Sequence, residues 1–212
     1  MARPKTILQS EFPYSVSARC INKEWFNLPM QEVWDVMTNH LYFAHHAYAA
    51  KIHSFVLMSN HFHLLLSTPQ ANLNKIMAYF MKETSRDISR LSGRINQTYG
   101  ARYYKCIIRS DHYFMNSYKY IYRNPVEAGL CQGVEEYPYS TINGLLGSSP
   151  VYIPMIEDTL LFENTYRTLA WLNFKTKNED RDSVKAALKR QYFKLPKNRN
   201  NSKPNHLEFD LL

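Results

Sequence analysis

Two histidines, His61 and His63, stand two positions apart in an apolar run that continues through Leu64 and Leu66. Side chains two positions apart in a β-strand leave the same face, so the two imidazoles would lie side by side. Imidazole is a common metal ligand, and the pair would supply two ligands of a metal site. The pattern equally fits two hydrogen-bonded core histidines or a half-exposed edge strand, so the pair alone leaves both readings open.

A second pair, Tyr120 and Asn124, could complete such a site. Residues four positions apart share a face if one helix carries both. An amide oxygen beside two imidazoles suits a hard divalent cation such as Mg²⁺ or Mn²⁺, and a neighbouring tyrosine could attack a metal-polarised phosphate. Each residue has a structural alternative. Asn124, with Pro125 and Glu127, fits the N-cap of a new short helix, and Tyr120 fits core packing.

The elements that must position these residues follow from hydrophobic periodicity and turn residues. Strands are predicted at 13–20, 51–57, 61–67 and 102–109, and helices at 30–50, 73–91 and 112–122. Asn72 and Asp111 are the expected N-caps of the last two helices, and Gly93 is the expected stop between them. This order predicts an α+β fold of the ferredoxin-like type, an antiparallel sheet with helices on its faces.

Beyond residue 150 the pattern weakens, so we expect a catalytic domain at 1–150 and a helical extension at 151–212. Helical patterns occupy 156–171 and 183–193, and the polar stretch 197–205 is expected to be disordered. Residues 173–205 hold ten Lys and Arg against three Asp and Glu, so most of the net charge of +8 lies there. We expect Lys185, Lys189 and Arg190 to contact phosphates.

Composition narrows the class of protein. The 212 residues are enough for a sizeable core, and no apolar run approaches the roughly 20 residues of a membrane span. No secretory signal is visible at residues 1–6, and the three cysteines form no Cys-x-x-Cys pair, so a cytoplasmic protein is expected. Positive charge combined with 16 Tyr and 11 Phe suits nucleic acid, because cations meet phosphates and rings stack on bases.

Two motifs in this order give the chain a family resemblance. Asn60-His61-Phe62-His63 follows an apolar run, and Tyr120-Ile121-Tyr122-Arg123-Asn124-Pro125 follows later. Together they resemble the REP-associated tyrosine transposases, members of the HUH single-tyrosine nucleases, over residues 14–141. The first strand, with Ser17-Ala18-Arg19, and the fourth, with Arg102-Tyr103, are similar as well. Ser59 stands where the family usually has proline before the Asn-His pair.

The resemblance implies a role for each candidate residue. His61, His63 and Asn124 would hold a divalent metal ion, Mg²⁺ or Mn²⁺, and Tyr120 would be the nucleophile. Because histidine must be neutral to bind a metal, activity is expected to fall as the pH drops through roughly 6.5. DNA contacts are expected at ten cations: Arg19, Lys82, Arg86, Arg90, Arg102, Lys105, Arg123, Lys185, Lys189 and Arg190. Three of these, Lys82, Arg86 and Arg90, could instead form a solvated helix face with Glu83 and Asp87.

The implied function is cleavage and rejoining of single-stranded DNA, with hairpin repeats as substrate, through a 5′-phosphotyrosine intermediate. The partner would be single-stranded or hairpin DNA, and the protein a monomer or a homodimer without a membrane partner. One alternative is a module of the same fold that binds DNA or RNA hairpins without cutting them. Another is a metal-dependent phosphoesterase that uses water in place of Tyr120.

Overall fold

The computed structural model describes residues 6–197 and 203–212. Its centre is an antiparallel sheet in the order β2-β3-β1-β4, made of β1 (Tyr14–Arg19), β2 (Lys51–Met58), β3 (His61–Ser67) and β4 (Tyr104–Ile107). The main helices are α1 (Met30–Tyr48), α2 (Leu73–Ser92) and α3 (Asp111–Glu127). This strand order and these connections confirm the predicted ferredoxin-like α+β fold.

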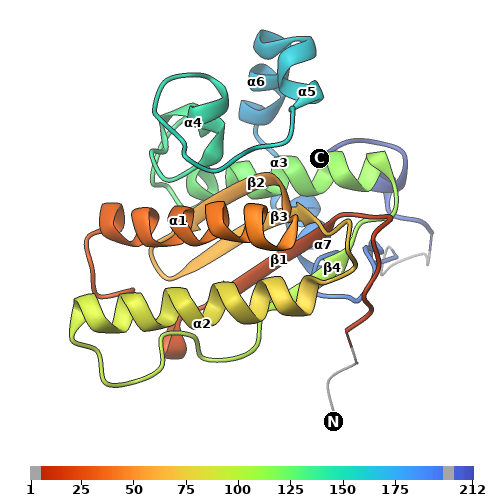
Figure 1. Ribbon diagram of the computed structural model, residues 1–212. Coiled ribbons are helices and arrows are strands. Elements are labelled where there is room, and N and C mark those ends of the chain that lie inside the picture. The colour runs from red at the N-terminus through yellow and green to blue at the C-terminus, as the bar shows by residue number, and fades with distance from the viewer. Residues whose placement is uncertain (1–5, 198–202) are drawn as a thin grey trace.

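The sheet separates two apolar cores, because side chains alternate along each strand. Phe62, Leu64 and Leu66 of β3 are fully buried in the core that α1 and α2 cover. Leu65, between them, is buried in a second core on the other face, beneath α3. Figure 1 shows α1 and α2 running side by side over one face and α3 over the other. The two faces of the sheet are therefore separate environments.

Short elements follow α3 and fill its surroundings. They are α4 (Thr141–Leu145), α5 (Thr159–Glu163), α6 (Thr165–Asn173) and α7 (Asn178–Ala187), with 3₁₀ turns at Val134–Glu136 and His206–Glu208. A further 3₁₀ turn, Ile21–Lys23, lies between β1 and α1. Figure 1 shows α4, α5 and α6 beyond α3, at the top of the view. Backbone from the C-terminal region borders both edges of the sheet. Met155 pairs with Ile52 of β2, and Tyr192 pairs with Ile107 of β4.

The end of the third predicted helix differs from the sequence-based expectation. Ser110, and not Asp111, is the N-cap of α3, and its hydroxyl accepts a hydrogen bond from the amide of Tyr113. The helix does not stop before Pro125 to begin again. It continues through Pro125 to Glu127, so Asn124 is a helical residue and not an N-cap. Packing of α3 along the second core outweighs the local cost of the proline.

Two helices of the extension also differ from their predicted bounds. The single helix predicted at 156–171 is divided into α5 and α6 at Asn164, whose side chain caps α6 by accepting from the amide of Arg167. The helix predicted at 183–193 begins earlier, at Asn178, and ends at Ala187. The sequence prediction overlooked the acidic residues Glu179 and Asp180, which lie in the first turn of this helix, where negative charge favours a helix start.

Part of the predicted disorder, at 198–202, lies outside the described residues. Within the described ranges, no helix is long and apolar enough to cross a membrane. The division of the chain at residue 150 stays a prediction, although Val184 and Ala187 of α7 are buried in the same core as α3.

Candidate active site

The face of the sheet that α3 covers carries both candidate histidines. His61 and His63 leave β3 on this face, with ring centroids 5.0 Å apart and ring planes at 80°. Phe62, between them, is buried on the opposite face, which fixes the orientation of its two neighbours. Their cross-strand partners on β1 are Arg19 beside His61 and Ser17 beside His63. The predicted same-face arrangement is present.

Asn60 determines which nitrogen of His61 is free. Its side-chain Nδ2 donates to the carbonyl of Lys23 at 2.8 Å, so its Oδ1 faces Nδ1 of His61 at 2.7 Å. An amide oxygen can only accept, so Nδ1 carries the hydrogen and Nε2 keeps its lone pair. Sequence reasoning missed this role, whose one signal is the position of Asn60 next to His61 in the turn.

Three tyrosines lie close together on α3, and only one has a free hydroxyl. Tyr118 donates to the carboxylate of Asp158 at 2.5 Å, and the Tyr122 hydroxyl lies 3.1 Å from Oγ1 of Thr141. Both rings are buried in the second core. Tyr120 points instead to the histidines, its ring edge-on to His63 with centroids 5.9 Å apart. Its hydroxyl makes no hydrogen bond to the residues that the structure describes.

Asn124 lies one turn after Tyr120, and Pro125 helps to orient it. Proline has no N–H, so the carbonyl of Ile121 lacks its usual helical partner. The Nδ2 of Asn124 turns back to the helix, donating to the carbonyl of Tyr120 at 2.7 Å and more weakly to that of Ile121 at 3.4 Å. The amide oxygen Oδ1 is therefore directed away from the helix backbone. It accepts no hydrogen bond from the described part of the chain.

These donors fit a divalent cation. Nε2 of His61, a ring nitrogen of His63 and Oδ1 of Asn124 are two nitrogens and one oxygen, a set compatible with Mn²⁺ or Mg²⁺. Among the described residues, the His63 ring has no hydrogen-bond partner. Among residues 6–197 and 203–212, no group of three His, Cys, Asp or Glu side chains is placed to hold a metal. The amide oxygen of Asn124 is the candidate for a third ligand beside the histidine pair.

Burial controls the protonation of the site. Desolvation, with the nearby charges of Arg19 and Lys185, lowers the pKa of His61 to about 4. Burial also holds the pKa of His63 well below its usual value. Both imidazoles are thus neutral and able to bind a metal at pH well below the expected 6.5. Burial raises the pKa of Tyr120 to about 12, so its phenol is protonated at neutral pH.

The expected DNA-contacting cations fall into separate groups. Arg19 lies beside His61 at the end of β1. Lys189 and Arg190 follow the end of α7 and are exposed. DNA contact at Arg123 is not supported. The side chain is 5% exposed, and its guanidinium binds Glu127 and the carbonyls of Leu172 and Asn173 inside the protein.

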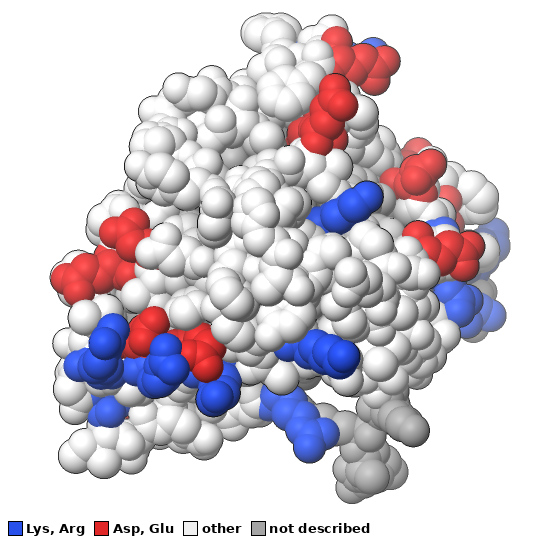
Figure 2. All heavy atoms as spheres, viewed as in Figure 1, with Lys and Arg blue, Asp and Glu red and all other residues white. Residues whose placement is uncertain are grey.

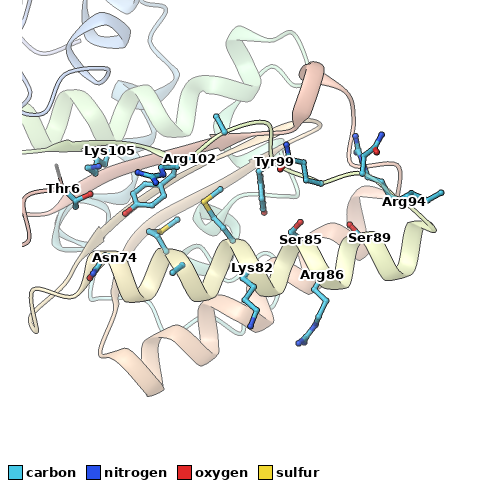
Figure 3. A pocket seen from close by; sticks show the side chains of 18 of the residues that line it. Thr6, Asn74, Lys82, Ser85, Arg86, Ser89, Arg94, Tyr99, Arg102 and Lys105 are labelled. Carbon is cyan, nitrogen blue, oxygen red and sulfur yellow. The ribbon is translucent and has the colours of Figure 1, made fainter. Parts of the chain in front are cut away.

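The stripe of three cations on α2, Lys82, Arg86 and Arg90, lies on the far side of the sheet from the histidines. Lys82 and Arg86 pair with Glu83, and Arg86 and Arg90 pair with Asp87. These ion pairs form the solvated helix face that was the alternative to DNA contact. Figure 2 shows these opposite charges gathered over α2. The helix also forms one wall of a groove of about 1250 Å³ that extends to β4 (Figure 3). Its cations are Lys82, Arg86, Arg94, Arg102 and Lys105.

Comparison with known proteins identifies the family of this chain. The family model "Transposase IS200 like" matches residues 16–124, just over half of the chain, from β1 to Asn124. The chain belongs to this family. The matched span holds all four residues of the candidate site, so this transposase carries its site within the segment that defines the family.

Two known proteins are similar to this chain. A Haemophilus influenzae protein described as a REP-associated tyrosine transposase is 26% identical over 98 residues. That match covers 41% of this chain and 56% of the relative, so the chain spans little more than half of the relative's length. A solved REP-associated tyrosine transposase bound to a REP hairpin is 18% identical with a TM-score of 0.58, covering 75% of this chain and 94% of that one. This likeness shows the fold.

Acid should destabilise the folded transposase partly through His61. The unfolded imidazole has a pKa near 6.5, and the folded one titrates at about 4. Above pH 6.5 neither state binds the proton, so stability is complete. Between pH 6.5 and 4 only the unfolded state takes up the proton, which removes up to about 3 kcal/mol. Without added metal, His61→Gln should therefore show a flatter dependence of the free energy of unfolding on pH, measured in urea.

The matched control for this experiment is His46→Gln, which changes an exposed histidine on α1. Its unfolding curves should follow the wild-type pH dependence. Equal pH dependence in wild type and His61→Gln would mean that His61 titrates alike in both states.

Proposed function

We propose that the chain cleaves and rejoins single-stranded DNA with Tyr120 as its nucleophile. The observation that carries the proposal is the free Tyr120 hydroxyl, on a ring edge-on to His63, while the neighbouring hydroxyls of Tyr118 and Tyr122 are engaged in the core. The family membership supports strand transfer as the reaction class. The named relative, a REP-associated tyrosine transposase, supports hairpin-forming repeat DNA as substrate.

The proposed reaction is a transesterification. The Tyr120 oxygen forms a bond to the phosphorus of a backbone phosphodiester while the bond from phosphorus to the 3′ oxygen breaks. The phenolic proton leaves the tyrosine, and the departing 3′ oxygen gains a proton to become a hydroxyl. The DNA 5′ end remains attached to Tyr120 as a phosphotyrosine ester. Attack by another 3′-hydroxyl reverses these steps and joins the strands, so no external energy source is required.

The chain's own residues prepare the site for this step. Asn60 fixes the tautomer of His61, burial keeps both imidazoles neutral, and Asn124 directs its amide oxygen outward. A divalent cation held by His61, His63 and Asn124 would polarise the phosphate and offset the charge that develops on it. Because the free phenol is protonated at neutral pH, substrate and cation must together favour its ionisation for attack to occur.

We further propose that the groove between α2 and β4 holds the double-stranded stem of the substrate. Lys82, Arg86, Arg102 and Lys105 line it, which suits the phosphates of a duplex, whereas the fifth lining cation, Arg94, is 7% exposed and paired with Glu24. The carboxylates beside Lys82 and Arg86 do not forbid this role, because exposed ion pairs contribute only about 0–1 kcal/mol and exchange readily for phosphate. The groove and the histidines lie on opposite faces, so the groove would contribute affinity and not chemistry.

The first test concerns the nucleophile. Tyr120→Phe removes one oxygen that has no partner among the described residues, so stability should be nearly unchanged. Strand cleavage and the covalent protein–DNA adduct should both disappear, while hairpin binding is retained. End-labelled hairpin DNA, incubated with Mn²⁺ and separated on a denaturing gel, measures both products.

Tyr122→Phe is the matched control. It removes the contact with Thr141 and should cost about 1 kcal/mol of stability, yet it should still form the adduct. An adduct that vanishes in Tyr122→Phe and persists in Tyr120→Phe would overturn the assignment. Cleavage by wild type without an adduct would indicate a phosphoesterase, and binding without cleavage would indicate the non-cutting module.

The second test concerns the metal. Mn²⁺ at about 100 times its dissociation constant should stabilise the wild-type fold by about 2.7 kcal/mol, seen as a rise in Tm. His61→Ala and His63→Ala should abolish this rise, and Asn124→Ala should weaken it. His53→Gln is the control: His53, near the start of β2, is also part-buried with its pKa lowered to about 4, and its Nε2 lies 2.8 Å from the Ser67 hydroxyl at the end of β3. If His53→Gln alone removed the Mn²⁺ effect, the proposed ligand set would be wrong.

The third test concerns the groove. The logarithm of hairpin affinity should fall with the logarithm of salt, and Arg102→Gln and Lys82→Gln should each reduce that slope by about 0.9 if they contact duplex phosphates. Arg90→Gln is the control, because Arg90 belongs to the same stripe but does not line the groove. Fluorescence anisotropy at several salt concentrations measures the slopes. If Arg102→Gln and Lys82→Gln show the same salt slope as Arg90→Gln, the stem does not lie in this groove.

A further inference from the structure

Helix α7 lies on the catalytic face of the sheet, beside α3. Val184 and Ala187 are fully buried in the second core, and the carbonyl of Ala187 accepts a long hydrogen bond from the thiol of Cys106 on β4, at 3.6 Å. The chain after α7 then runs along β4, where Ile107 donates to Gln191 and accepts from Phe193. Packing and backbone pairing thus fix this helix relative to the sheet that carries the histidines.

An ion-pair network joins α7 to the helix of the nucleophile. Arg181 donates to one carboxylate oxygen of Glu127 at 2.8 Å, and Arg123 binds the other oxygen at 2.7 Å. Glu127 follows Tyr120 by seven residues and Asn124 by three, so all three lie along one side of α3. Arg181 is therefore held at the side of α3 that faces the candidate site, with most of its five N–H donors still available.

Lys185 follows Arg181 by four residues and shares its face of α7. It is exposed, and within the described ranges no carboxylate forms an ion pair with it. The charges of these two residues reach the site, since Lys185 acts electrostatically on both histidines and Arg181 on Tyr120. The neighbouring Asp182 acts on Tyr120 with the opposite sign and is exposed. Arg19 from β1 is a third cation whose charge acts on both histidines and on Tyr120.

We propose that α7 belongs to the active site and supplies Arg181 and Lys185 to bind the non-bridging oxygens of the scissile phosphate, with Glu127 as the residue that positions Arg181. This inference rests on the proposed strand transfer at Tyr120. A phosphodiester under attack gains negative charge on these oxygens, and cations fixed before the reaction stabilise it without reorganising. Arg181 is suited to this role because a planar guanidinium can bind two oxygens at once.

The binding test uses the full chain in a Tyr120→Phe background, so that DNA is held without being cut. Arg181→Gln and Lys185→Gln should each reduce the salt slope of affinity for a single-stranded oligonucleotide by about 0.7, the value for one phosphate contact. Arg167→Gln, an exposed cation on α6, is the charge-matched control and should leave the slope unchanged. Thermal melting confirms that each variant is folded.

The kinetic test restores Tyr120 and measures adduct formation in a single turnover at saturating DNA with Mn²⁺. Arg181→Gln and Lys185→Gln should each slow this step by about 100-fold or more, as removal of a transition-state donor does. Lys185→Arg should recover most of the rate, since it keeps the charge. Glu127→Gln, which loosens Arg181 without removing it, should show a smaller loss.

Two results would overturn the proposal. One is an unchanged salt slope together with unchanged adduct formation in both variants. The other is faster adduct formation in Lys185→Gln, which would mean that α7 hinders the reaction. If wild type forms no adduct at all, the proposed strand transfer fails, and the salt slopes in the Tyr120→Phe background still decide whether Arg181 and Lys185 bind phosphate.

Discussion

The alternation of side chains along β3 determines where chemistry is possible in this transposase. Phe62, Leu64 and Leu66 are fully buried against α1 and α2, so His61 and His63 must face the other way. A register shift of one residue would place two imidazoles in an apolar core and three large apolar side chains beneath α3. Burial of these three side chains, at about 1.5–3 kcal/mol each, makes such a shift very unfavourable. The stability of one face thus fixes the geometry of the other.

Helix α3 carries the other two residues of the candidate site, and a proline interrupts its backbone hydrogen bonding there. Pro125 deprives the carbonyl of Ile121 of its helical partner, and the side chain of Asn124 turns back to the backbone there. The amide oxygen is left facing outward, one turn from Tyr120. A residue that sequence rules assign to a helix start is thus used inside a helix. The local cost of the proline accompanies a side chain whose orientation is set by the backbone.

Local sequence patterns predicted the features that depend on residues close together in the sequence. The shared face of His61 and His63 follows from the period of two, the hairpin from two apolar runs around a polar turn, and the fold class from the order of strands and helices along the chain. Long-range contacts were beyond such reasoning. Nothing in the spacing of Glu127 and Arg181, 54 residues apart, indicates that they pair. The same limit explains Arg123, whose charge suggested DNA but whose partners are carbonyls at Leu172 and Asn173.

The sheet separates the two cores, and this separation affects how substitutions can accumulate in the protein during evolution. Substitutions among the exposed residues of α2 and the segment before β4 alter the groove without touching the packing of α3, α7 or the histidines. Effects on opposite faces should therefore combine nearly additively. If the groove holds DNA and the histidine face carries the chemistry, as proposed, substitutions could change which DNA is bound while the reaction is preserved. A fold with a single shared core would not give mutation this freedom.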